Sequence, residues 1–143
     1  MNMKTLGKVL MTLAIAVFTF IPPLADLATD THVFHPGWMP HARVHTVWLL
    51  GLTSSVGVLA LYLLWFRKID SEFSESLAGV LGAIVYGSFF LSALTIGLYG
   101  GALSDHEGGI GQTIIGLDLN LFTFGLASTV LCVGWGLCKW ARI

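Results

Sequence analysis

Residues 44–66 read VHTVWLLGLTSSVGVLALYLLWF, a run of 23 residues without an aspartate, glutamate, lysine or arginine. About 20 consecutive apolar residues are enough for an α-helix to cross the hydrocarbon core of a bilayer. The run is therefore predicted to be a membrane-spanning helix. Arg67 and Lys68 follow it directly and mark one end of the span.

Three further segments have the same apolar character, at roughly residues 6–27, 77–99 and 113–138. The chain of 143 residues is 55% hydrophobic and only 10% charged, whereas soluble domains carry about 25% charged residues. We therefore expect an all-α fold in which residues 1–143 form a single integral membrane bundle of four transmembrane helices.

The first segment allows two interpretations. Lys4 and Lys8, followed by a short apolar run, also fit a secretory signal peptide. The length of the segment favours a retained span. Pro22 and Pro23 are predicted to bend or end this helix, because proline cannot continue a regular helical hydrogen-bond pattern.

The basic residues predict the orientation of the bundle. All but one of them fall in three places that share one side of a four-helix topology: Lys4, Lys8, Arg67, Lys68, Lys139 and Arg142. Only Arg43 falls on the other side. An excess of lysine and arginine marks the cytoplasmic side, so both termini are predicted to be cytoplasmic in a bacterial-type inner or plasma membrane. The net charge of −1 and the lack of a basic patch predict no nucleic-acid partner.

All five histidines fall on the predicted outer side. Four of them lie within fourteen residues, and the fifth lies in the second outer loop: His32, His35, His41, His45 and His106. His41 and His45 are spaced so that a helix would place both rings on one face. Asp105 and Glu107 flank His106, and carboxylates commonly orient metal-bound imidazoles.

Three interpretations of this histidine cluster compete. In the first interpretation, the histidines are hydrogen-bonding residues that hold the loop at residues 28–43 against the second span. Alternatively, His32, His35, His41 and His45 together bind zinc or non-haem iron, for which imidazole is a suitable ligand. No HExxH metalloprotease motif is present. In the third interpretation, one histidine is the axial ligand of a haem held between helices.

Two short motifs resemble those of the styrene oxide isomerases, a family of small four-helix membrane enzymes. The first motif is Gly37-Trp38, and the second, at the start of the second span, is Ala42-Arg43-Val44-His45. A glycine-rich third span, a glycine-rich outer loop and an acidic residue opening the fourth span, here Asp118, also follow the arrangement of that family. The similarity of arrangement covers most of the chain, and the motif covers about nine residues.

The resemblance implies a haem b-dependent homotrimer that isomerises a small apolar substrate, an epoxide, to a carbonyl compound. The resemblance makes His45 the iron ligand. The family's third-helix tyrosine has no direct counterpart here, and for the same reaction Tyr86 is our candidate hydrogen-bond donor to the developing alkoxide and Asp118 a candidate orienting residue. The chain departs from the family at Gly51, where the family has an asparagine. Two alternatives therefore stay open: a non-haem metal-dependent enzyme that uses the four clustered histidines, and a non-catalytic membrane binding subunit.

Small residues in the third span recur at four-residue spacing, at Gly79, Ala83 and Gly87. Such residues allow helices to approach closely. They are predicted either to pack within one bundle or to form a subunit interface. Cys132 and Cys138 lie in the cytoplasmic half of the fourth span and are expected to be packing residues.

Overall fold

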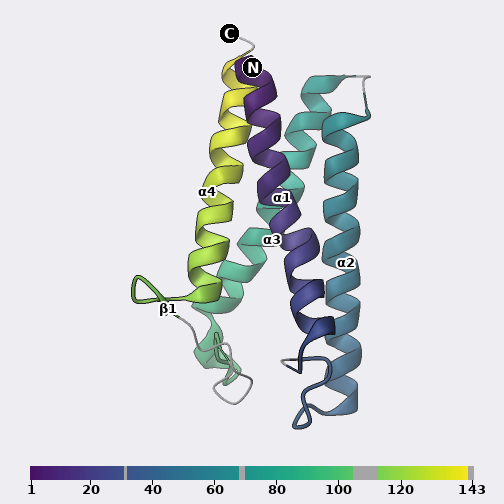
Figure 1. The fold of residues 1–143 in the computed structure, drawn as a ribbon, viewed down its shortest axis with the longest axis vertical. Coiled ribbons are helices and arrows are strands. Elements are labelled where there is room, and N and C mark those ends of the chain that lie inside the picture. The colour runs from purple at the N-terminus through teal and green to yellow at the C-terminus, as the bar shows by residue number, and fades with distance from the viewer. Residues whose placement is uncertain (31, 68–69, 105–112, 142–143) are drawn as a thin grey trace.

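The computed structural model describes residues 1–30, 32–67, 70–104 and 113–141, and it shows an all-α bundle there (Figure 1). The long helices are α1 (Met3–Ala28), α2 (Pro40–Trp65), α3 (Ser71–Leu94) and α4 (Leu119–Trp140). A short 3₁₀ helix, η1 (Ile96–Leu98), follows α3. Each long helix is long and apolar enough to cross a membrane, so the prediction of an all-α chain with four apolar spans is confirmed.

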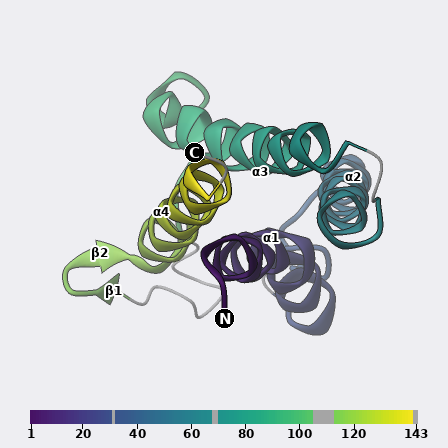
Figure 2. The same ribbon diagram turned by 90° about the horizontal axis from the view of Figure 1, so that it is seen from above.

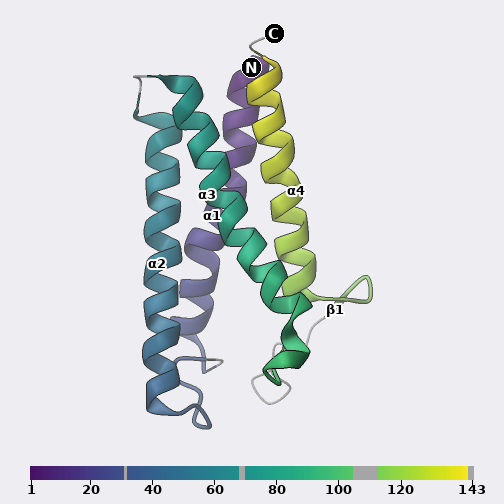
Figure 3. The same cartoon turned by 180° about the vertical axis from the view of Figure 1, so that it is seen from behind.

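Successive helices run in opposite directions, and α1 packs along α4 to close the bundle. This arrangement places the two termini together at one end (Figure 1). Seen along the bundle, the helices follow one another in chain order around it (Figure 2). α3 crosses obliquely, so that its first turns lie beside α2 and its last turns lie beside α4 (Figure 3). At the end away from the termini, α1 and α2 therefore form one pair of helices, and α3 and α4 form another.

The helix ends differ from those predicted. α2 begins at Pro40, earlier than the predicted residue 44, because proline is well suited to the first position of a helix. α4 begins at Leu119 rather than near residue 113. The residues before it form an antiparallel hairpin of two short strands, β1 (Thr113–Ile114) and β2 (Leu117–Asp118), which projects sideways from the bundle (Figures 1 and 2).

Pro22 and Pro23 lie inside α1, which continues to Ala28, so they do not end the helix. Pro23 has no N–H for the carbonyl of Thr19, four residues earlier. In its place, the Ser54 hydroxyl of α2 donates a hydrogen bond to that carbonyl at 2.9 Å. Side-chain donors of this kind make proline tolerable within a membrane helix, because they satisfy the freed backbone oxygen.

The core holds residues from all four helices, among them Met11, Ile15, Phe18, Leu64, Tyr86 and Leu131. The backbones of α1 and α4 approach closely, since a Cβ added to Gly7 would lie 2.6 Å from the carbonyl oxygen of Gly134. On α3, Gly79 packs against the ring of Trp135, whereas Gly87 has open space around it. The small residues of α3 therefore do not form one packing face within the bundle.

Candidate functional site

The loop between α1 and α2 is tied to both helices by two of its histidines. His32 Nδ1 lies 2.7 Å from Asp26 Oδ1 near the end of α1. The carbonyl of His35 accepts a hydrogen bond from Arg43 Nη2 in α2 at 3.0 Å, and His35 Nδ1 accepts one from the Gly37 backbone N–H at 3.1 Å. For these two histidines, the contacts match the interpretation that they hold the loop in place.

His41 and His45 form a separate pair on the first turns of α2. Their Nε2 atoms are 3.0 Å apart, and their rings are nearly perpendicular, with centroids 4.6 Å apart. Both residues are exposed. The prediction that the two rings share one face of a helix is confirmed. The pair can share one proton in a hydrogen bond, with one ring donating and the other accepting.

The same geometry suits a cation held between the two rings. Zinc binds imidazole nitrogen at about 2.0–2.1 Å, and two nitrogens at that distance from one ion lie about 3 Å apart or slightly more. The observed separation of 3.0 Å is in this range. The pair is therefore a ready two-nitrogen chelate, because the helix already fixes the spacing of its ligands.

The structure does not bring the four clustered histidines to a single point. Two of them, His32 and His35, hold the loop, and the other two lie on α2. Among the residues that the structure describes, no group of three or more histidine, cysteine, aspartate or glutamate side chains is placed to hold a metal ion. His106, Asp105 and Glu107, which were expected to approach the cluster, lie outside the described residues.

An open apolar hollow lies on the outside of α2, and neither His41 nor His45 lines it. It is about 430 Å³ in volume and is lined by Arg43, Val44, Val47 and Trp48. The Trp48 ring lies 6.1 Å from that of His45. The Nε atom of Arg43 is buried and has no hydrogen-bond partner in the described part of the chain. Arg43 and His45 are two residues apart on α2, so their side chains leave the helix on different faces.

Tyr86 and Asp118, the two other predicted site residues, make structural contacts elsewhere. The Tyr86 hydroxyl is buried and donates to the carbonyl of Ala14 at 2.6 Å, which joins α3 to α1. Asp118 caps α4, and its carboxylate accepts hydrogen bonds from the backbone N–H groups of Asn120 and Leu121 at 2.8 and 3.4 Å. His45 contacts residues of its own helix, α2.

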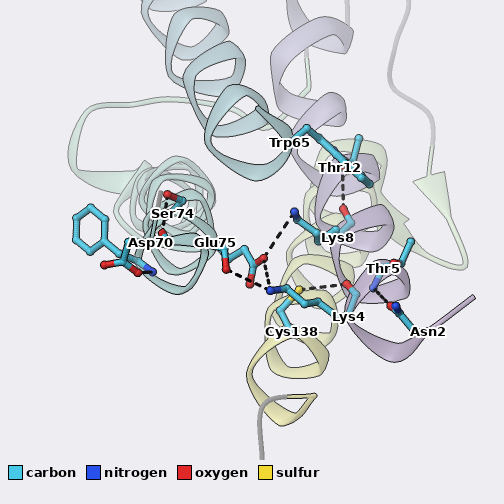
Figure 4. Close-up of polar contacts among 12 residues, drawn as sticks. Asn2, Lys4, Thr5, Lys8, Thr12, Trp65, Asp70, Ser74, Glu75 and Cys138 are labelled. Atoms are coloured by element: carbon cyan, nitrogen blue, oxygen red, sulfur yellow. Dashed lines mark hydrogen bonds and ion pairs between the residues drawn. The ribbon is translucent and has the colours of Figure 1, made fainter. Parts of the chain in front are cut away.

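A buried ionic cluster lies at the end of the bundle that holds the termini (Figure 4). Glu75 of α3 has a side chain only 1% exposed, and its Oε1 lies 3.1 Å from Lys4 Nζ and 3.6 Å from Lys8 Nζ. Lys8 Nζ also lies over the ring of Trp65, 5.1 Å from its centroid. Glu75 was not predicted as a site residue, because the third span was expected to begin near residue 77. The available signal was the helical spacing of Lys4 and Lys8, which places both ammonium groups on one face.

Comparison with known proteins supplies no relative: no family model, no curated protein and no solved structure matches this chain. The geometry of the two polar clusters is therefore the basis for a functional assignment.

Proposed function

We propose that this chain is a multi-pass membrane metalloprotein that binds its metal through the His41–His45 pair. The observation that supports the proposal is the 3.0 Å separation of two exposed imidazole nitrogens. Imidazole binds both zinc and non-haem iron well. The metal site that we propose is thus smaller than the predicted four-histidine site, since His32 and His35 are engaged with the loop and with α1.

We place the pair on the outer side of the membrane. It lies at the end of α2 away from the termini, whereas Lys4, Lys8 and Arg67 lie at the other end. Cationic residues favour the cytoplasmic side. The 26 residues of α2 extend about 39 Å at 1.5 Å per residue, beyond a hydrocarbon core about 30 Å thick. The first turn of α2 then reaches headgroup level, where metal ions arrive from water.

The reaction that we propose is isomerisation of a small apolar substrate, such as an epoxide, to a carbonyl compound. Support for it comes from the resemblance to the styrene oxide isomerases. A bound metal would supply Lewis-acid polarisation of the substrate oxygen. Val44, Val47 and Trp48 would contact the apolar part of the substrate along this open hollow. We give Tyr86 and Asp118 structural roles, because each already has hydrogen-bond partners within the bundle.

Haem b is a second candidate for the metal group. The resemblance to the styrene oxide isomerases favours it. His45 would be the iron ligand. The open side of the hollow would need cover from another subunit, which agrees with the trimer that the resemblance implies. Haem would supply the same Lewis-acid chemistry through its iron.

Removal of single histidines from the purified protein tests these proposals. If the pair chelates one ion, His41→Ala and His45→Ala should both lose stoichiometric zinc or iron, measured by elemental analysis, because each removes half of the chelate. His35→Ala is the matched control and should keep the metal. Loss of metal from His35→Ala as well would replace the pair with the four-histidine site.

An absorption spectrum separates haem from a bare ion. A Soret band that is lost in His45→Ala but retained in His41→Ala would identify haem with a single axial histidine. A colourless protein that takes up no metal would contradict both forms of the proposal and would leave a non-catalytic binding subunit.

A further inference from the structure

We infer that a second copy of this chain completes the metal site, with two α2 helices meeting side by side and each supplying His41 and His45. The inference rests on the proposed function, since it takes the histidine pair to be a metal ligand. It adds the partner, the surface that binds it and the full set of ligands.

The number of ligands is the first argument. Catalytic zinc sites use three protein ligands, and structural zinc sites use four. The pair supplies two, and the described ranges of the chain place no third metal-binding side chain with them. Both imidazoles are exposed on the surface of α2. Further ligands can therefore approach from outside the bundle.

The surface that continues from the pair along α2 is the second argument. On the side of α2 that carries His41 and His45, large apolar side chains remain exposed further along the helix. They include Leu52 at 54%, Leu59 at 49% and Tyr62 at 53%. This face is distinct from the one that packs in the bundle, which carries Leu50, Gly57, Ala60, Leu63 and Leu64. One side of α2 is thus unpartnered from the histidines to the far end of the helix.

Small residues lie in the middle of this face. A Cβ added to Gly51 would meet nothing within 4 Å. The Ser55 hydroxyl is exposed and donates to the backbone carbonyl of Gly51 at 2.8 Å, so it needs no other partner. Two small residues spaced four positions apart on a helix allow two membrane helices to approach closely. Gly51 and Ser55 therefore suit a helix–helix contact between copies.

Symmetry brings the two histidine pairs together. Copies inserted in the same orientation are related by an axis along the membrane normal, so their α2 helices run parallel and identical residues face one another. The contact at Gly51 and Ser55 then places both pairs at the same depth, and four imidazoles meet at one point. Four ligands fill a tetrahedral zinc site, whereas six-coordinate iron would keep two positions for a substrate. Iron is thus the ion that suits the proposed reaction.

The experiment uses full-length protein in detergent, stripped of metal with a chelator and then titrated with Zn²⁺. Native mass spectrometry should show a dimer with one ion per two chains. His41→Ala and His45→Ala should lose both the ion and the metal-dependent gain in dimer. His35→Ala should keep both. One ion bound to a monomer would overturn the second-copy inference and leave the proposed function standing. An absence of bound ion would overturn both, and a metal-bound trimer would overturn the two-fold arrangement.

A cross-linking measurement tests the surface without metal. In a Cys132→Ala background, Ser55→Cys in vesicles should be joined to a second copy by a short bifunctional maleimide. Ser88→Cys on α3 is the matched control, since Ser88 is also exposed and its hydroxyl also donates to its own helix backbone, at 2.8 Å. We expect at least tenfold more cross-linked dimer from Ser55→Cys. Equal cross-linking at the two positions would show that α2 does not form the interface.

Discussion

Two side-chain pairs spaced four residues apart lie at opposite ends of the bundle, and their surroundings differ. Lys4 and Lys8 converge on one carboxylate, which is 1% exposed. An ionised group in a membrane segment is costly unless it is paired. In this cluster the carboxylate and the two ammonium groups already pair with one another. His41 and His45 are exposed, and no acidic partner contacts them in the described part of the structure. Of the two pairs, the histidines are the one able to take up a further ligand.

Replacement of Glu75 tests the ionic cluster. Glu75→Ala removes the partner of both lysines, and a hydrogen bond to a charged group contributes about 1.5–3 kcal/mol. We expect the loss to lie at the lower end of that range, because the Lys4 side chain is 37% exposed and can turn to water. Thermal unfolding followed by circular dichroism should show a lower midpoint for Glu75→Ala. Asp30→Ala, which removes an exposed carboxylate after α1, is the control. Equal midpoints for the two variants would show that the cluster does not stabilise the bundle.

The spacing of residues in the sequence predicted the His41–His45 pair. It did not predict that His32 and His35 would lie apart from that pair. Residues four apart on a helix must share a face, so the sequence alone was sufficient for that pair. The positions of His32 and His35 depend on the path of a loop, on the Asp26 carboxylate and on Arg43. These contacts join residues six and eight positions apart outside a single helix, where no periodic rule applies. For the same reason, the contact between Tyr86 and Ala14 was not predictable.

At the scale of whole elements, hydropathy predicted the helices well and their ends less well. Lipid requires each spanning segment to satisfy its own backbone hydrogen bonds, so a long apolar run has few alternatives to a helix. Near the membrane surface this requirement weakens. There, Pro40 starts α2 early, and the hairpin of residues 113–118 delays α4. Hydropathy also placed Glu75 outside the third span. A hydropathy profile contains no information about contacts between helices, so it does not show that Lys4 and Lys8 of α1 pair with this carboxylate.

The contact between α1 and α2 depends on Gly57. A Cβ at this position would overlap the Thr19 hydroxyl, beside the carbonyl that Ser54 satisfies. Gly57→Ala should therefore destabilise the protein by about 1–3 kcal/mol through overpacking. Gly87→Ala is the matched control, because Gly87 has open space and alanine is the better helix former. Thermal unfolding in detergent should rank Gly57→Ala below the parent protein and Gly87→Ala at or above it. The reverse order would show that α2 does not approach α1 at Gly57.

In the whole molecule, α1 is joined to every other long helix. It meets α4 at Gly7, α2 through Thr19, and α3 both through Ala14 and through the two lysines. α2 has no such central position, since it packs against α1 and α3 and keeps one face exposed along its length. α1 is therefore the helix that contacts all the others, whereas α2 packs against α1 and α3. An oligomer built through α2 would leave the contacts of α1 intact.

The placement of the histidines on the outer side depends on the orientation of the bundle, which cysteine labelling can test. Native thiols are first removed as Cys132→Ala and Cys138→Ser, the serine being chosen because Cys138 is buried against the carbonyl of Lys4. Single cysteines are then placed as Phe34→Cys in the loop after α1, Ser104→Cys after η1, and Glu72→Cys at the start of α3.

An impermeant maleimide added to intact cells should label Phe34→Cys and Ser104→Cys, because the cationic end of the bundle is expected to stay in the cytoplasm. Glu72→Cys should react only after the membrane is permeabilised. Labelling of Glu72→Cys alone would invert the bundle and place the histidine pair on the cytoplasmic side, where the proposed metal would come from the cytoplasmic pool. Different labelling of Phe34→Cys and Ser104→Cys would contradict the arrangement of four antiparallel spans, since both positions lie at the end of the bundle away from the termini.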